Sequence, residues 1–272
     1  MRRYAVLALI AALVIACQGY EKIEETGRVR PSLQYSEAEM NALGNEAYAQ
    51  VLAEANIEEG TPRAEMVDRV GRKIAAVVSQ NYDWQFALIN DDKTANAFCL
   101  PGGKVAVYTG ILPLTENEDG LAAVLGHEIA HATLQHANER MSEPVLKRLI
   151  SLPVRITVGM WDALSPGSQK LVLGSFGLGY IVGEFMPYSQ EHEFEADIVG
   201  IRYVHEAGYD MEEAPRFWKR MAEAFPEGDH ADPMSTHPPS TARAERLRKE
   251  IDKIEAADAA ASSSSGDDNA AD

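Results

Sequence analysis

Apolar residues in the first third of the chain recur at helical spacing. Ser36 and Glu39 have the spacing of a capping box, which predicts a helix from there to about Ala55. Thr61 and Pro62 predict the start of a second helix, because Thr can cap it and Pro fits its first position. Its apolar positions are Met66, Val70, Ile74 and Val77.

From residue 84 the pattern changes to short apolar runs that are typical of strands. These runs cover residues 84–89, 95–100 and 104–109, and Pro101-Gly102-Gly103 forms a turn between the last two. Residues 121–137 are strongly helical again. The sequence therefore predicts an α+β fold that is mainly helical and contains a small β-sheet.

Three more helices are predicted in the C-terminal half. Ser189 caps one that ends near Ala207, a second contains Trp218, and a charged one starts at Ser240. The apolar, glycine-rich segment 171–187 fits either a lid or membrane-facing loop, or a helix that uses glycine for close packing. We expect one domain over residues 32–255 and a disordered Ala-, Ser- and Asp-rich tail over residues 256–272.

The charge of the chain narrows the range of partners. Its formal net charge is -17, which argues against nucleic acid as a partner.

The N-terminus has the features of a lipoprotein signal peptide over residues 1–16. Two arginines precede an apolar run that is too short to span a bilayer comfortably, and residues 14–17 resemble a bacterial lipobox that ends in Cys17. A lipidated Cys17 would then begin a linker over residues 17–31. An uncleaved anchor, or a plain signal peptide with an incidental cysteine, is the alternative. Because Gln18 follows the cysteine, we expect a lipid-anchored protein on the periplasmic side of the outer membrane.

Residues 127–131, His127-Glu128-Ile129-Ala130-His131, have the HExxH pattern on a predicted helix. Positions four apart lie on one face of a helix, about 6 Å apart along its axis, so His127 and His131 can bind one metal ion. Glu128 lies about 100° around the helix, where it can take a proton from a metal-bound water. Because this pentapeptide also occurs by chance, a third ligand is needed to support a zinc site.

The extended HExxH pattern does not supply that ligand. Its third histidine would stand at position 137, which is Ala137, and His136 is interpreted as a helix-end or surface residue. On the helix after Ser189, Glu193 and Asp197 fall within about 40° of each other and face inward, whereas Glu195 falls on the far side. Glu193 as the third ligand and Asp197 as the group that orients a ligand histidine would explain two buried carboxylates. A buried salt-bridge pair is the alternative.

With these residues in place, the chain resembles metallopeptidase family forty-eight, the gluzincins that include the CAAX prenyl endopeptidases, HtpX, OMA, BepA and LoiP. The resemblance extends over residues 36–250, and Gln190 departs from it because the family usually has Arg there. It is nearest to stand-alone periplasmic lipoprotein members. The matching motifs are Asn96-Ala97-Phe98, Pro101-Gly102-Gly103, Val107-Tyr108-Thr109-Gly110, Leu125-Gly126-His127-Glu128, Glu193 with Asp197, and Ser235-Thr236-His237-Pro238.

The resemblance implies a zincin-like domain with one Zn²⁺ per chain, held by His127, His131 and Glu193, with Glu128 as the catalytic base. It also implies that His237 can approach the zinc as an inhibitory fourth ligand, and that Arg243 helps to hold substrate or the developing oxyanion. The alternatives are a turn residue before two prolines for His237 and a solvated helix charge for Arg243.

We therefore expect a metalloendopeptidase that hydrolyses unfolded or misassembled cell-envelope polypeptides. An extended substrate would add to the edge strand at Asn96, Ala97 and Phe98. The alternative is an outer-membrane assembly chaperone with a closed, mostly inactive zinc site.

Overall fold

The computed structural model describes residues 19–142, 169, 172–173, 188–225, 237 and 241–267 of the chain. The predicted signal peptide, the lipidation site Cys17 and most of the glycine-rich segment lie outside the described residues, so these calls stay predictions. Within the described ranges, no helix combines the length and the apolar character needed to cross a bilayer.

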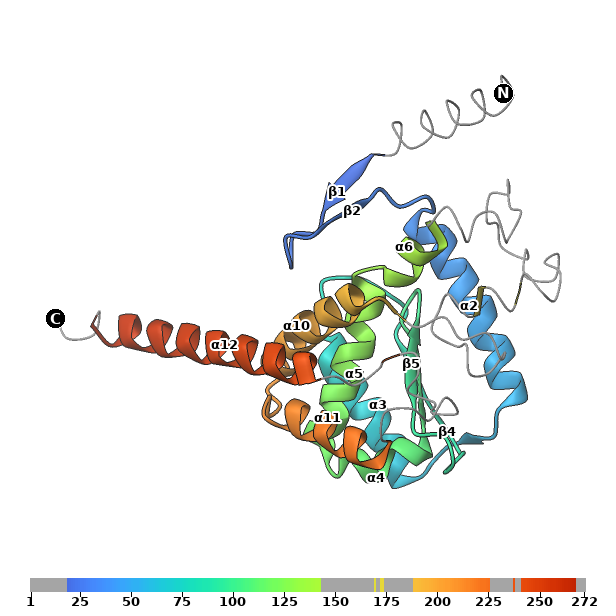
Figure 1. The fold of residues 1–272 in the computed structure, drawn as a ribbon. Helices are drawn as coiled ribbons and strands as arrows, with labels where there is room; N and C mark the ends of the chain where they lie inside the picture. The colour runs from blue at the N-terminus through green and yellow to red at the C-terminus, as the bar shows by residue number, and fades with distance from the viewer. Residues whose placement is uncertain are drawn as a thin grey trace, which may run out of the picture.

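A four-stranded sheet lies in the middle of the domain (Figure 1). Its order is β3 (Ile57–Glu58), β4 (Gln85–Ile89), β6 (Lys104–Tyr108) and β5 (Ala97–Leu100). β4 and β6 run parallel, and the other two pairs are antiparallel. The three strands predicted from the sequence are present, and β5 is an edge strand, as expected.

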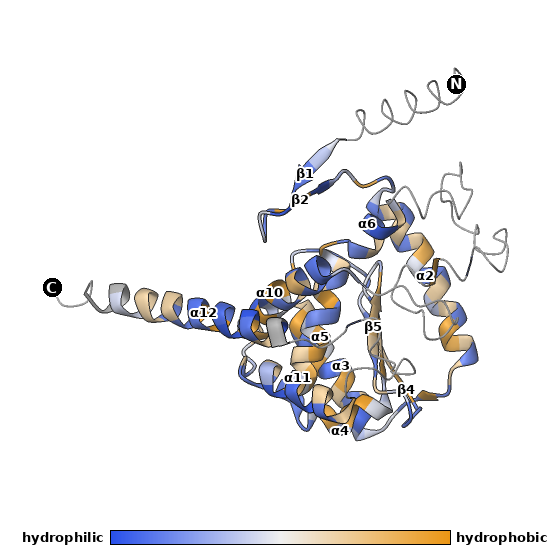
Figure 2. Cartoon of the chain, viewed as in Figure 1, coloured by the Kyte–Doolittle hydropathy of each residue, from blue (hydrophilic) through white to orange (hydrophobic). Residues whose placement is uncertain are grey.

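The two faces of the sheet pack into different cores. Helix α2 (Glu37–Glu54) covers one face, and α3 (Pro62–Ala75) and α5 (Glu118–Thr133) cover the other (Figure 1). Because strand side chains alternate, neighbouring residues of β5 and β6 enter opposite cores. The core with α2 receives Phe98, Leu100, Ala106 and Tyr108, and the core with α3 and α5 receives Ala97, Cys99, Val105 and Val107. Hydrophobic residues therefore line the sheet on both sides. Strand β5 accordingly has the colour of hydrophobic residues in Figure 2.

The helix starts follow the sequence signals. Ser36 forms a complete capping box with Glu39, and Thr61 caps α3 with proline in its first turn. Ser189 caps α10 (Gln190–Glu206), which ends before Gly208 at φ +71°. These helix predictions are confirmed.

Helices α5 and α10 cross in close contact at two glycines. A Cβ at Gly200 would lie 2.8 Å from the carbonyl carbon of Gly126, and a Cβ at Gly126 would lie 2.8 Å from the Gly200 oxygen. Only a pair without side chains permits this approach. The crossing brings the HExxH segment of α5 against the carboxylates of α10.

Shorter elements and two C-terminal helices complete the domain. After β6 come η1 (Thr109–Ile111) and α4 (Leu112–Thr115), and α11 (Glu213–Ala224) and α12 (Thr241–Asp267) follow α10. The α+β, mainly helical fold class is confirmed.

The structure differs from the predictions in three places. The predicted helix 121–137 is two helices, because α5 ends at Thr133 and α6 (His136–Ser142) starts after Gln135, whose φ is +57°. Residues 20–31, predicted as part of a linker, form a hairpin of β1 (Tyr20–Lys22) and β2 (Val29–Pro31). Helix α12 continues past residue 256, where a disordered tail was expected, because alanine is the strongest helix former.

Candidate metal centre

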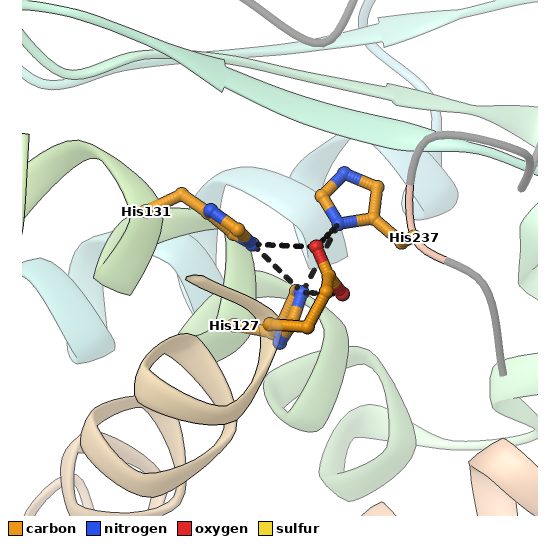
Figure 3. Close-up of side chains that lie close together, drawn as sticks. His127, His131 and His237 are labelled. Atoms are coloured by element: carbon orange, nitrogen blue, oxygen red, sulfur yellow. Dashed lines mark hydrogen bonds and ion pairs between the residues drawn. The ribbon is translucent and has the colours of Figure 1, made fainter. Parts of the chain in front are cut away.

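Four buried side chains converge where α5 crosses α10. They are His127 and His131 from α5, Glu193 from α10 and His237 from the segment before α12, and one possible ligand atom of each lies within 4.8 Å of the others. Figure 3 shows the three histidine rings turned toward a common point. The structure therefore brings the three predicted ligands and the predicted fourth group together.

The spacing of these atoms fits a tetrahedral zinc site. Zinc binds histidine nitrogen and carboxylate oxygen at about 2.0–2.2 Å, so neighbouring ligand atoms should lie roughly 3.3 Å apart. His127 Nε2 lies 3.1 Å from His131 Nε2 and 3.2 Å from His237 Nδ1. Glu193 Oε1 lies 3.4 Å from His131 Nε2 and 2.9 Å from His237 Nδ1. Two or three histidines with one glutamate are also a donor set that zinc prefers.

Asp197 holds His127 from behind. Its Oδ1 lies 3.0 Å from His127 Nδ1, so a proton on Nδ1 leaves Nε2 free to face the centre. Burial alone would raise the pKa of Asp197, but Arg243 more than offsets it and holds this pKa below its usual value. The contact is the one that the helical spacing predicted for Asp197.

Arg243 is a buried side chain of α12 that binds two carboxylates. Its Nε and Nη2 each lie 2.8 Å from an oxygen of Asp197, and its Nη1 lies 2.7 Å from Glu193 Oε2. The guanidinium also lies 3.9 Å from the ring centre of Trp218. This burial excludes a solvated helix charge. The guanidinium faces the carboxylates of Asp197 and Glu193, and its role toward substrate or the oxyanion stays a prediction.

His131 is supported differently, through a second histidine. His136 Nδ1 lies 2.9 Å from His131 Nδ1, and His136 Nε2 lies 3.2 Å from Glu195 Oε2. Burial lowers the pKa of both His131 and His136 well below the usual value. The interpretation of His136 as a surface residue was wrong, because its side chain is fully buried.

An arginine of the N-terminal hairpin completes this second support. Arg28 Nε lies 2.7 Å from Glu195 Oε2, and its two terminal nitrogens bind the two oxygens of Glu139 at 2.7 and 2.6 Å. Burial would raise the pKa of Glu139, but the hydrogen bond from Arg28 and the proximity of His192 lower it to about 2. Glu195 does lie on the side of α10 opposite Glu193, but the hairpin buries it there.

Local sequence signals do not reveal this network. His136 and Glu195 lie 59 positions apart, and Arg28 and Glu195 lie 167 positions apart. The helical spacing of α10 predicted one buried face, which contains Glu193. The hairpin covers the opposite face and buries Glu195 there as well.

Glu128 lies beside the cluster without belonging to it. Burial, the largest influence, raises its pKa above the usual value, which favours a carboxylate that can accept and return a proton. The other nitrogen of His237, Nε2, lies 3.8 Å from Glu128 Oε1, so this ring contacts both the cluster and the expected base. The edge strand is also covered, since Ala97 and Phe98 are each 2% exposed and Asn96 Oδ1 accepts the Ala97 amide.

Two histidines spaced i and i+4 on one helix, with a glutamate from a second helix, define a zinc metallopeptidase domain of the HExxH class. Residues 62–251, more than half of the chain, match the family model Peptidase family M48. The chain belongs to this family, whose members are zinc-dependent metallopeptidases.

Curated relatives agree with this assignment. The mitochondrial metalloendopeptidase OMA1 of Schizosaccharomyces pombe is 35% identical over 214 residues, 76% of this chain and 59% of the relative. The mitochondrial metalloendopeptidase OMA1 of Danio rerio is 31% identical over 244 residues, 83% of this chain and 49% of the relative. The beta-barrel assembly-enhancing protease of Yersinia pestis is 29% identical over 187 residues, 67% of this chain and 37% of the relative. The matched region thus spans at most 59% of the length of each of these relatives.

The comparisons contradict the expected placement on the periplasmic side of a bacterial outer membrane. The relatives from S. pombe and D. rerio are mitochondrial by name. That expectation depended on residues 14–18, which lie outside both the family match and the described residues.

Proposed function

We propose that this protein is a zinc-dependent endopeptidase that cleaves unfolded or misassembled polypeptides. The convergence of His127, His131 and Glu193, with Glu128 beside them, is the observation that carries the proposal. The family membership and the names of the relatives support the metalloendopeptidase class.

In this proposal His127, His131 and Glu193 hold the zinc. When bound, zinc supplies a Lewis acid that polarises the scissile carbonyl and stabilises negative charge on its oxygen. Glu128 takes the proton of the attacking water and returns a proton to the leaving amine. Asp197 fixes the tautomer of His127, and Arg243 holds Asp197 and Glu193 in place.

The substrate class follows from the position of β5. An extended polypeptide can add to the edge of a sheet by backbone hydrogen bonds, and here Ala97 and Phe98 must first be uncovered. Asn96, Ala97 and Phe98 begin this edge strand, and β5 packs directly on α5, which carries the HExxH segment. This arrangement favours unfolded chain segments as substrates.

The substitution Glu128→Gln tests the assignment of the base. We expect it to retain one zinc per chain and to lose cleavage of an unfolded protein such as reduced casein, because the amide cannot accept the proton. The matched control is Glu118→Gln at the exposed start of the same helix, which should cleave like the unaltered protein. Unchanged cleavage by Glu128→Gln would refute the assignment.

A second candidate function is a binding or chaperone role with a closed site. It is favoured by His237, whose Nδ1 lies within 3.2 Å of both His127 Nε2 and Glu193 Oε1 and fills a fourth ligand position. Structural zinc sites have four protein ligands, whereas catalytic ones keep a position open. If the site is a resting peptidase, His237→Ala should increase cleavage; if cleavage stays absent while zinc is bound, the binding role is supported.

A further inference from the structure

The hairpin of residues 20–31 contacts residues that lie behind the metal ligand His131. In the sequence it precedes the region that matches the family model. It lies beside α6 and α10 (Figure 1). Both Thr26 Oγ1 and Arg28 Nε donate to Glu195 on α10, while the other arm of Arg28 binds Glu139 on α6. The hairpin therefore ties these two helices together directly behind His131.

The proton positions along this path follow from the metal site. If His131 Nε2 binds a metal, its Nδ1 must carry the proton and donates it to His136 Nδ1, 2.9 Å away. His136 then carries its own proton on Nε2 and donates it to Glu195 Oε2 at 3.2 Å. Each ring then has one donor and one acceptor, so the direction of the hydrogen bonds is fixed from the metal ligand to Glu195.

Glu195 can orient His136 as the terminal acceptor only if its carboxyl group is held in place. Arg28 supplies the opposite charge at 2.7 Å, and its planar guanidinium bridges Glu195 and Glu139 in a fixed geometry. Without Arg28, the buried carboxylate of Glu195 would lose its ion pair and be held less firmly against His136, whereas Glu139 would keep Arg30 at 3.8 Å.

We propose that the N-terminal hairpin is a functional part of the metal centre, with Arg28 as a positioning residue that orients His131 through Glu195 and His136. This inference rests on the proposed assignment of His131 as a zinc ligand. It extends the metal centre to a segment that lies before residue 62, where the family match begins.

The test measures zinc affinity by competition with a chromogenic chelator in the full-length protein. Arg28→Ala and Glu195→Gln should each weaken zinc binding about tenfold, the lower end of the usual effect of losing an outer-shell partner. Lys22→Ala, which removes the same charge from an exposed position of the same hairpin, should leave the affinity unchanged. Arg28→Lys should give an intermediate loss, because it keeps the charge but not the fork.

Comparison of these variants distinguishes a positioning role of Arg28 from a general effect on stability. The double variant Arg28→Ala/Glu195→Gln should bind zinc no more weakly than the weaker single variant, since both act through one path. Zinc affinity equal to that of Lys22→Ala, with only a lower unfolding midpoint of the zinc-free protein, would overturn the proposal. His131→Ala must abolish tight binding; if it does not, the ligand assignment itself fails, which is a distinguishable result.

Discussion

The two ligand histidines of α5 have unequal supports. A carboxylate contacts His127 directly, since Asp197 Oδ1 lies 3.0 Å from its Nδ1, and the buried Arg243 of α12 holds this carboxylate. His131 instead contacts a neutral imidazole, and the charged pair of Glu195 and Arg28 lies one residue further out. The hairpin, near the start of the described chain, thus supports His131, and α12, at its end, supports His127.

The two supports differ in how deeply their arginines are buried. The side chain of Arg243 is 3% exposed, whereas that of Arg28 is 18% exposed. An ion pair with full burial is costly to break, because the remaining charge is left without solvent. The arginine that supports His127 is therefore part of the buried core, whereas the arginine that supports His131 is partly exposed to solvent.

The largest effect, a loss of zinc affinity, should come from changing Asp197, which contacts His127 directly. Asp197→Asn removes the charge that fixes the His127 tautomer and leaves Arg243 with one carboxylate fewer. We expect zinc affinity to fall about 100-fold, the upper end of the range for such partners, in a chelator competition titration. Asp68→Asn, an exposed partner of Arg72, is the control and should have no effect. A loss no greater than that of Arg28→Ala would remove the distinction between the two supports.

A smaller effect, on the stability of the fold, is expected from the crossing of α5 and α10, which positions both supports. Gly200→Ala places a methyl group 2.8 Å from the Gly126 carbonyl carbon, so α5 and α10 must move apart. Urea unfolding of the zinc-free protein should show a loss of about 1–3 kcal/mol, as for other overpacked sites. Glu206→Ala, at the exposed end of the same helix, should change stability by less than about 0.5 kcal/mol. Wild-type stability in Gly200→Ala would contradict the close crossing.

The smallest effect concerns the stability of the hairpin at acid pH. The pKa of Glu139 in the folded protein is about 2, below its ordinary value of 4.5, so the unfolded chain binds the proton more readily. Its stabilising contribution is complete above about pH 4.5 and is lost as pH falls toward 2. Hydrogen exchange should therefore show the amides of residues 20–31 losing protection over this range.

The matched variant for the acid experiment is Glu139→Gln, which has already lost the charge. Its hairpin amides should be less protected at neutral pH and should change less on acidification. If both proteins show the same pH dependence, Glu139 is not the group that titrates.

Local sequence signals were sufficient for the direct support. Ser189 marks the start of α10, and helical spacing alone then places Glu193 and Asp197 on one inward face. His127 and His131 follow from the HExxH spacing in the same way. These inferences succeeded because the residues that interact lie on two regular helices whose faces can be calculated.

The indirect support could not be predicted, because it depends on how distant segments pack. The interpretation of Glu195 as a far-side residue was geometrically right, but it contained no information that a hairpin would cover that side. The break after Thr133 turns His136 back toward His131, and this turn depends on the positive φ of Gln135. For Arg243 the resemblance drew attention to the residue, and the structure showed which groups it contacts.

X-ray diffraction at the zinc absorption edge tests the central claim most directly. Crystals of the zinc-loaded protein should show one anomalous peak per chain, about 2 Å from His127 Nε2, His131 Nε2 and a carboxylate oxygen of Glu193. His136 and Asp197 should lie behind these ligands without touching the metal. A peak elsewhere, or no peak in protein loaded with zinc, would contradict the account.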